Sequence, residues 1–334
     1  MSTSSIKSAW LRRLGFSLAL SACGIAVAGQ AFAADTLNVR FSWKLKGEYA
    51  PFYVAKENGY YKANNLDVNL GEGAGAPAAL GSLLQGQEDA VVLPGIFAIQ
   101  AIRRGMPLKL IAIYHPVAPM GLVSRADNPV REPKNLIGKT VATSVGDTTT
   151  QFMKVLCEHN KIDCNAIHLV NTDSSSRVSL MITGKADVAG AYYDDDLPML
   201  EARHIKLATL DLAKYGVSVP GLAVVTSDKI LASKGPVLQR FLTSVDKAIS
   251  DCRADPDKAA QLFLKNWNGG PDQAVVAKQI QVMAQYATRY PDHPVGWIDQ
   301  AVIEKSLAEL KQSDNIDSSL PASAYFSNAV QPKQ

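Results

Sequence analysis

Short β-rich runs alternate with helical stretches along the chain, and this alternation constrains the fold more than any other feature of the sequence. The first series fills residues 37–114, and the pattern restarts after Asn128-Pro129. Strands that alternate with helices at this spacing are typical of βαβ units, whose strands run parallel in one sheet. The sequence therefore predicts two α/β units in succession, each built on a mostly parallel sheet.

The individual elements follow from the spacing of apolar residues and from turn residues. The first unit is expected to have strands at 37–43, 66–70, 90–93 and 108–114, and helices at 50–61, 77–84 and 96–102. The second is expected to have strands at 139–142, 167–170, 187–192, 205–210 and 222–226, and helices at 149–160 and 177–183. Apolar residues at three- and four-residue spacing then predict a helical C-terminal segment with helices at 237–250, 256–267, 273–290 and 299–312.

The first 33 residues have the composition of a secretory signal peptide. Three basic residues lie within the first 13 positions, and no acid lies within the first 33. Residues 14–29 form a short apolar stretch, and Ala31-Phe32-Ala33 offers the small residues that signal peptidase needs. The apolar stretch is shorter than the roughly 20 residues that a membrane span takes. We therefore expect cleavage near Ala33 and export to the periplasm.

A lipoprotein signal is the second interpretation of the same segment. Leu20-Ser21-Ala22-Cys23 has the form of a lipoprotein cleavage box, which would place a lipid anchor on Cys23. Apolar residues continue through 25–27, where a lipoprotein would turn polar. Cleavage near Ala33 is for this reason the preferred prediction.

The charge of the chain is concentrated in the predicted signal peptide. The whole chain has 34 Lys and Arg against 31 Asp and Glu, and the part that follows residue 33 carries 31 of each. A neutral body has no global field that attracts nucleic acid or an anionic membrane surface. Since 47% of the residues are hydrophobic and 19% are charged, the chain is also too apolar to be disordered. We expect an exported monomer that does not bind nucleic acid.

Three cysteines follow the predicted signal peptide, in a compartment that permits disulfides. Cys157 and Cys164 lie on either side of a polar turn, which favours a local disulfide between them. Cys252 would then be the odd cysteine, buried in the core. There is no CxxC motif and no Cys/His ligand spacing, so the sequence predicts no structural zinc site.

The loops that follow strands hold the candidate site residues, because ligands of open parallel sheets bind at the carboxyl ends of strands and at helix N-termini. The first unit contributes Trp43 and Tyr49 after its first strand, Gly73 after its second and Gly95 after its third. Aromatic rings can stack on a flat ligand, and glycines let backbone approach it. A purely structural role, in the core for Trp43 and in a tight turn for Gly95, is an equal alternative.

The second unit contributes polar and aromatic candidates, which are Ser144, Gly146, Asp147, Thr148, Tyr192 and Tyr193. The first four lie between a strand and a helix and offer hydroxyls and backbone N–H groups to a carboxylate, a sulfonate or a polar ring edge. N-capping of the helix by Asp147 or Thr148 is compatible with that role. The two tyrosines could close over a ligand. The aspartates 194–196 that follow them are predicted to cap a helix rather than to bind a metal.

Motifs of catalysis are absent from the sequence. GxSxG, HExxH and Walker A motifs are missing, and the five histidines are scattered without a paired acid or nucleophile: His115, His159, His168, His204 and His293. Gly71-x-Gly73-x-x-Ala76 approaches a dinucleotide fingerprint, but the acid expected at the end of the next strand is missing. We therefore expect neither enzyme activity nor a bound cofactor.

Residues 43–68, WKLKGEYAPFYVAKENGYYKANNLDV, resemble the N-terminus of periplasmic solute-binding proteins of the thiamine-pyrimidine, sulfonate and nitrate group. The resemblance extends to Gly86-x-x-Asp89 and to residues 135–141, 184–188 and 255–260. It implies a two-lobed, periplasmic-binding-protein-like α/β fold of type II, with parallel-rich sheets. Lobe 1 would comprise residues 34–120 and 224–334, lobe 2 would comprise residues 121–223, and segments near 116–125 and 220–228 would join them.

The same resemblance implies a function in transport. Such a protein captures a small organic solute (a sulfonate, a pyrimidine-like or an aromatic or anionic molecule) by cleft closure, and delivers it to an ABC permease and its ATPase in the inner membrane. Pyrimidine-binding members tend to carry a histidine before Ala-Pro, where this chain has Tyr49. An aromatic or anionic solute is therefore as well supported as a pyrimidine.

Two other functions are compatible with the resemblance. One is an enzyme, since related fungal proteins build the thiamine pyrimidine with a cysteine-rich iron motif and a sacrificial histidine. This chain has no cluster of cysteines, and Tyr49 lies near the place of that histidine. The other is a ligand sensor that docks to a membrane receptor instead of an importer.

Overall fold

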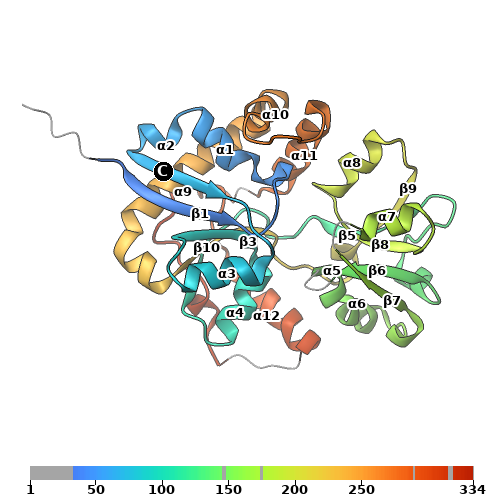
Figure 1. Cartoon of the computed structure of the whole chain (residues 1–334). Coiled ribbons are helices and arrows are strands. Elements are labelled where there is room, and N and C mark those ends of the chain that lie inside the picture. The colour runs from blue at the N-terminus through green and yellow to red at the C-terminus, as the bar shows by residue number, and fades with distance from the viewer. Residues whose placement is uncertain (1–32, 145–147, 174–175, 289, 315–318, 334) are drawn as a thin grey trace, which may run out of the picture. The chain divides into compact units, whose positions relative to one another are not determined.

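Two five-stranded sheets with flanking helices make up the described part of the chain (Figure 1). The computed structural model describes residues 33–334, apart from 145–147, 174–175, 289, 315–318 and 334. Residues 34–334 form one compact unit. Within the described residues, no helix combines the length and the apolar character that crossing a membrane requires. The predicted signal peptide lies outside the described residues, except for Ala33.

The first sheet has the strand order β2-β1-β3-β10-β4. Its strands are β1 (Asp35–Phe41), β2 (Leu66–Gly71), β3 (Ala90–Pro94), β4 (Leu108–Ile113) and β10 (Leu222–Ser227). β1 pairs in parallel with β2 and β3, whereas β10 pairs antiparallel with β3 and β4. Four strands thus run one way, and β10, which comes from the far end of the second series, runs the other way.

The second sheet repeats this plan in the order β7-β6-β8-β5-β9. Its strands are β5 (Met120–Arg125), β6 (Thr140–Ser144), β7 (His168–Thr172), β8 (Val188–Tyr192) and β9 (Leu207–Asp211). β6 is parallel to β7 and β8, and β5 is antiparallel to β8 and β9. The parallel-rich α/β class predicted from the sequence is confirmed, while β5 was not among the predicted strands.

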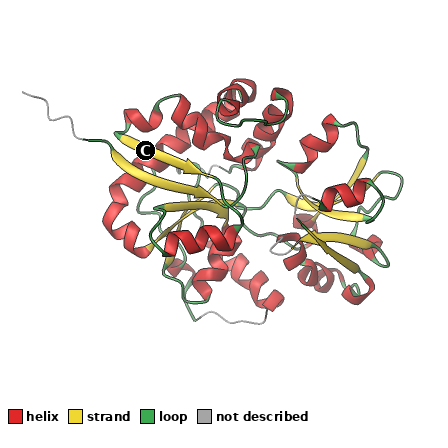
Figure 2. Ribbon diagram, viewed as in Figure 1, coloured by secondary structure: helices red, strands yellow, loops and turns green. Residues whose placement is uncertain are grey.

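Helices lie along both sheets, and Figure 2 shows them in red around the yellow strands. They are α1 (Ala50–Glu57), α2 (Tyr60–Ala63), α3 (Ala76–Leu84), α4 (Gly95–Arg103), α5 (Thr148–Gln151), α6 (Met153–Asn160), α7 (Arg177–Ile182), α8 (Asp196–Ala202), α9 (Asp228–Ala254), α10 (Pro256–Leu264), α11 (Gln273–Tyr286) and α12 (Gln300–Asp314). The helical C-terminal segment predicted beyond Gly235 is therefore present.

The alternation of side chains along each strand divides the core of the first sheet into two layers. Val92 on β3 belongs to the hydrophobic cluster that includes α1, α9, α10 and α11. Its neighbours Val91 and Leu93 belong to the cluster that includes α3 and α4. Successive side chains of a strand point to opposite faces, so a strand covered on both faces reads as one continuous apolar run. This is why residues 90–93 carry no polar residue.

Two of the helix boundaries that differ from the prediction do so for clear local reasons. The helix expected at 50–61 is split into α1 and α2, because Gly59 adopts a left-handed backbone conformation with φ of 72°. The helix expected to begin at 237 already begins at Asp228, where the Ser227 side chain accepts a hydrogen bond from the backbone N–H of Ile230. Non-helical angles at Lys234, two residues before Pro236, mark a kink inside α9.

Two segments connect the sheets, and backbone hydrogen bonds pair them with each other. Residues 114–119 lead from β4 to β5, and residues 212–221 lead from β9 to β10. The N–H of Ala118 donates to Val219 O (2.7 Å), and the N–H of Gly221 donates to His115 O (2.8 Å). The chain therefore crosses between the sheets twice, at one place.

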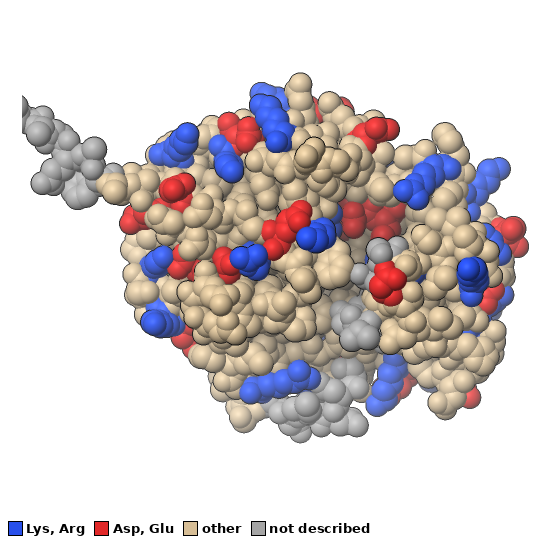
Figure 3. Space-filling view, in the orientation of Figure 1, with Lys and Arg blue, Asp and Glu red and all other residues tan. Residues whose placement is uncertain are grey.

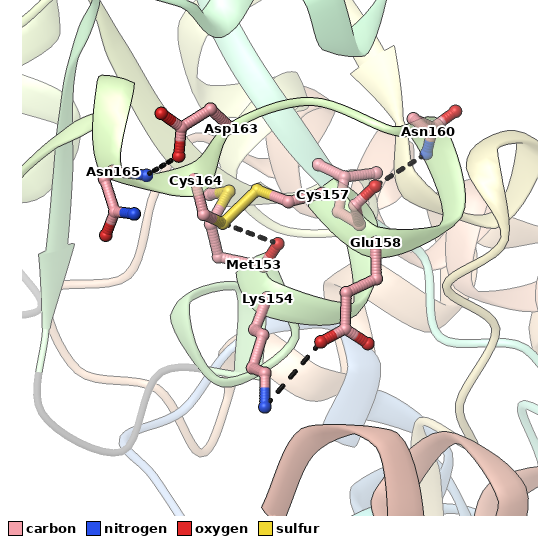
Figure 4. The surroundings of a disulfide bond; sticks show 9 residues. Met153, Lys154, Cys157, Glu158, Asn160, Asp163, Cys164 and Asn165 are labelled. Carbon is pink, nitrogen blue, oxygen red and sulfur yellow. Dashed lines mark hydrogen bonds and ion pairs between the residues drawn. A yellow bond between two sulfur atoms is a disulfide. The ribbon is translucent and has the colours of Figure 1, made fainter.

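A disulfide joins Cys157 on α6 to Cys164 in the short 3-10 helix Cys164–Ala166 (Figure 4). The two Cα atoms are 5.6 Å apart, and the bridge closes a loop over the turn between them. Asp163 caps the 3-10 helix by accepting from the N–H of Asn165 (3.0 Å). Cys252 is a free cysteine, buried on α9.

We predict that the Cys157→Ala/Cys164→Ala variant unfolds with a free energy about 2 kcal/mol lower than the wild type, because a small closed loop restricts the unfolded chain. Guanidinium unfolding followed by circular dichroism measures this difference. Reductant should lower the stability of the wild type and leave the variant unchanged. Equal stability of the wild type with and without reductant would contradict a structural role of the bridge.

Candidate functional site

The loops that follow β1 and β2 are bonded to each other at the carboxyl edge of the first sheet. The N–H of Gly73 donates to Trp43 O (3.2 Å), and the N–H of Gly75 donates to Ser42 O (2.7 Å). A Cβ on Gly73 would overlap the backbone oxygen of Phe41, so only glycine permits this approach. Trp43 itself is 42% exposed. These two loops therefore hold the Trp43 side chain in a position exposed to solvent.

Gly95, at the start of α4, contacts the second crossing segment. Its N–H donates to Gly221 O (2.7 Å), and a Cβ added to it would meet Pro220 Cβ at 3.2 Å. The N–H of Gly95, which was predicted to bind a ligand, is therefore bonded within the protein. The tight-turn alternative accounts for this glycine in the structure.

A cluster of buried charged side chains lies where the loops of both sheets meet. It comprises Lys46 and Glu48 after β1, His115 after β4, and Asp194 after β8. Lys46 Nζ lies 2.8 Å from Glu48 Oε1, and one ligand atom each of Glu48, His115 and Asp194 lie within 4.8 Å of one another. These three residues are buried, and His115 and Asp194 are 0% exposed. We call these four residues the buried charge cluster.

Helix α11 closes this cluster against the loop between β8 and α8. The amide of Gln279 donates to Asp195 Oδ1 (2.9 Å) and to Asp195 O (3.1 Å). One turn further along α11, Met283 O lies 3.2 Å from His115 Nε2. Gln279 also packs directly on Gly47, whose missing side chain makes room for it. The same helix therefore holds residues from the first loop, the crossing segment and the second sheet.

The electrostatics of the cluster follow from burial and from its own charges. Burial alone would lower the pKa of Lys46, but Glu48 and the neighbouring aspartates outweigh it and raise this pKa well above its ordinary value. Burial, followed by the charge of Glu48, raises the pKa of Asp194 well above its usual range. Burial lowers the pKa of His115 to about 4, so its ring is neutral at pH 7. Burial and then Asp196 raise the pKa of Asp195 to about 7.

The predicted tyrosines border this cluster. Tyr49 is fully buried, with its ring stacked on Phe41 at 4.3 Å between centroids. Lys46 Nζ lies 5.4 Å from the ring centre of Tyr49 and 5.2 Å from that of Tyr192. The hydroxyl of Tyr192 in turn lies 2.8 Å from Thr148 Oγ1. Lys46 thus lies near a predicted aromatic residue of each sheet.

The other predicted residues of the second unit make other contacts or lie outside the described part of the chain. Ser144 ends β6 and is buried. Tyr193 donates its backbone N–H to Pro119 O (2.7 Å) in the first crossing segment, and its hydroxyl packs against Gly121. Gly146 and Asp147 lie outside the described residues.

A hollow of about 420 Å³ lies elsewhere, among α1, α9 and α10. Its polar group Asp251 already accepts hydrogen bonds from Asn58 Nδ2 (2.9 Å) and from the Tyr60 hydroxyl (2.5 Å). Since these groups satisfy one another, the hollow offers a ligand less than the buried charge cluster does.

Residues 46–259, well over half of the chain, match the protein family described as NMT1/THI5 like. The chain belongs to this family. It is 23% identical over 326 residues to the formylaminopyrimidine-binding protein of Halalkalibacterium halodurans, covering 93% of this chain and 95% of that one.

Solved structures share the fold at low sequence identity. The periplasmic aliphatic sulphonate binding protein SsuA from Escherichia coli superimposes with a TM-score of 0.69 at 15% identity, over 90% of this chain and 93% of that one. The desulfurization enzyme DSZB does so with a TM-score of 0.60 at 14% identity, over 89% and 97%. The two-lobed periplasmic-binding-protein fold expected from the resemblance is confirmed.

One expectation about this family member is wrong. The sequence suggested that the histidines are scattered with no acid near them, but ligand atoms of Glu48 and Asp194 lie within 4.8 Å of His115, without a hydrogen bond to its Nδ1 among the described residues. The three residues are far apart in sequence, with Glu48 seven residues after β1, and His115 and Asp194 two residues after β4 and β8, so only the fold brings them together. Had the rule that sites lie after strands been applied to β4 as well, His115 would have been a candidate.

The aspartates 194–196 have three different environments rather than one shared role. Asp196 Oδ2 accepts from the N–H of Tyr192 (2.8 Å) and pairs with Arg177 (2.9 Å), which fits the predicted structural role at the start of α8. Asp195 is held by Gln279. Asp194 points into the buried charge cluster. Lys46, Glu48 and Gln279 were not predicted as site residues at all.

We predict that Gly47→Ala lowers the free energy of unfolding by about 1–3 kcal/mol, because the added methyl group overlaps Gln279 and forces α11 away from the loop. Gly81→Ala in α3 is the matched control, since no atom lies within 4 Å of its added Cβ. This control should gain about 0.5–1 kcal/mol from its higher helix propensity. Urea unfolding of both variants measures the contrast, and equal effects would argue against tight packing at Gly47.

Proposed function

We propose that this chain is the periplasmic solute-binding component of an ABC importer and that it binds a small nitrogen heterocycle of the pyrimidine type. The observation that carries the proposal is the likeness along 93% of the chain to a protein named for binding formylaminopyrimidine. The family assignment and the fold shared with a sulphonate-binding protein support a solute-binding role. The solute lies between the loops of the two sheets, and the sheets close on it.

The charge of the site favours a pyrimidine over a sulfonate. A sulfonate needs an unpaired cation or several converging N–H groups. The cation of the buried charge cluster is Lys46, which is already paired with Glu48 and lies near two aspartates. In Figure 3 a group of acidic side chains is recessed near the middle of the visible face. Amino groups of a heterocycle are better partners for such surroundings than an anion is.

Aromatic side chains supply the apolar part of the proposed site. Trp43 is exposed at the carboxyl edge of the first sheet, and Tyr192 ends β8 in the second sheet. Rings that face a planar heterocycle from two sides hold it by stacking, without a net charge. The proposed role of Tyr49 is indirect, because its buried ring supports Lys46 rather than offering an open surface.

Binding without catalysis is the second part of the proposal. The relative found along most of the chain is named as a binding protein, whereas the enzyme among the structural neighbours shares the fold at 14% identity. Fold alone does not determine function. The permease, the ATPase and the periplasmic location belong to the proposal, as does the monomeric state. Co-purification of the chain with a detergent-solubilised ABC permease would support transport, whereas co-purification with a membrane receptor instead would support sensing.

A thermal-shift screen tests the solute class. We expect a formylaminopyrimidine to raise the melting temperature in a saturable manner, and alkanesulfonates to leave it unchanged. A shift with sulfonates alone would reject the pyrimidine assignment and retain the solute-binding role. Turnover of a pyrimidine that depends on the protein would instead reject the proposal of binding without catalysis.

Trp43→Ala should weaken binding of the cognate solute by about 1–3 kcal/mol, which corresponds to a Kd roughly 5- to 150-fold higher. The reason is the loss of an aromatic contact in the closed state. Leu84→Ala is the control, because Leu84 is equally exposed (41%) but ends α3, at the opposite end of the sheet from the strand carboxyl termini. Calorimetry measures both, and an unchanged Kd for Trp43→Ala would remove the stacking role.

A further inference from the structure

The buried charge cluster contains three side chains that can share one ion. Glu48, His115 and Asp194 each offer one ligand atom, and these atoms lie within 4.8 Å of one another. They come from the loop after β1, the crossing segment after β4 and the loop after β8. Their relative exposures are 5%, 0% and 0%. Three ligands from three segments, buried together, form a built site rather than an accidental group on the surface.

The hydrogen bond of His115 leaves one ring nitrogen ready for a ligand. Nε2 lies 3.2 Å from Met283 O, and a carbonyl oxygen only accepts, so Nε2 carries the proton. Nδ1 then presents a lone pair, and it has no hydrogen-bond partner among the described residues. Metal-bound histidines characteristically donate their other N–H to a backbone carbonyl or a carboxylate, which fixes the tautomer and the ring orientation.

Asp194 presents a second open group. Its side chain is 0% exposed, and neither carboxylate oxygen has a hydrogen-bond partner within the described part of the chain. Buried polar groups are nearly always satisfied, so an exception of this kind points to a missing ligand. The open atoms of His115 and Asp194 are acceptors, and the ligand that completes them must therefore bring positive charge or donors.

Acidic groups outnumber cationic groups around the site. Glu48, Asp194 and Asp195 carry three formal negative charges, and Lys46 carries one positive charge. Lys46 contacts Oε1 of Glu48, which leaves the second oxygen of that carboxylate for another partner. An excess of buried carboxyl groups, removed from water, requires compensation by protons or by a cation. A bound cation is one such compensation.

We infer that Glu48, His115 and Asp194 bind one divalent transition-metal ion of the zinc class. Mixed imidazole and carboxylate ligands suit such an ion, whereas magnesium and calcium prefer oxygen ligands alone. With metal–ligand distances of about 2.0–2.2 Å, binding draws the most distant ligand atoms together by about 1 Å. Three protein ligands leave a fourth position open to water or to an atom of the solute. Because the three ligands come from both sheets, the ion stabilises their closed arrangement.

Calorimetric titration of the untagged, EDTA-treated protein with zinc alone tests the inference in a buffer that does not chelate metals. We expect one zinc ion per chain. Asp194→Asn and His115→Gln should each weaken zinc binding at least tenfold, whereas the exposed control variants Asp257→Asn and His168→Gln should bind as the wild type does. Cobalt bound in place of zinc should give the visible absorption of a low-coordinate site, and His115→Gln should change that spectrum.

Two results would overturn the inference: no stoichiometric zinc binding by the wild type, or site variants that bind zinc as tightly as the controls. Circular dichroism melting shows whether each variant is folded, and Glu48→Gln provides a third variant if one of the others is not. The inference does not rest on the identity of the solute. A protein that binds a pyrimidine equally well after EDTA treatment and takes up no zinc would overturn the metal site and retain the proposed function.

Discussion

The hydrogen bonds between the two crossing segments are the constraint on which the rest of the structure depends. Each sheet receives its antiparallel strand through one of them: β5 follows residues 114–119, and β10 follows residues 212–221. Because Ala118 bonds to Val219 and Gly221 bonds to His115 O, the two strands enter their sheets from one shared point. Gly95 ties α4 to the same point through Gly221 O. The carboxyl edges of both sheets are thereby held next to the crossing, and the loops after the strands meet there.

This arrangement explains why charged groups are buried in a chain whose net charge after residue 33 is zero. His115 belongs to a crossing segment, so its position is set by backbone pairing rather than by its own side chain. Glu48 and Asp194 reach it from loops on either sheet, and α11 covers them through Gln279 and Met283. Charges in such a place cost solvation that nearby opposite charges only partly return. Because these buried charges do not stabilise the fold, they are better explained by a role in binding.

The sequence predicted the elements much better than the site. Apolar runs such as residues 90–93 identify strands buried on both faces. The A-x-A pattern and the pair Cys157 and Cys164 are each contained in a few neighbouring residues, so they too can be recognised in the sequence. β5 was not predicted, because it lies between a crossing segment and a polar turn. No α-helix follows it to mark a βαβ unit. The buried charge cluster escaped because its members are separated by 67 and 79 positions along the sequence. Trp43 and Tyr192 could be proposed from the sequence, since an aromatic residue at or just after the end of a strand is visible locally.

The duplication of one sheet plan has a further consequence for the site. In both sheets the fourth strand runs against the other four, and in the first sheet that strand is β10, which follows all the strands of the second sheet in the chain. The first sheet therefore cannot be completed by its own series of βαβ units alone, whereas the strands of the second sheet are consecutive in the chain. A rotation of one sheet relative to the other must be absorbed by the few residues of the crossing segments, and His115 is one of them. The metal ion that we propose for His115, Glu48 and Asp194 would act at the crossing segments, where a small displacement of side chains would correspond to a large change at the outer loops if the sheets rotated.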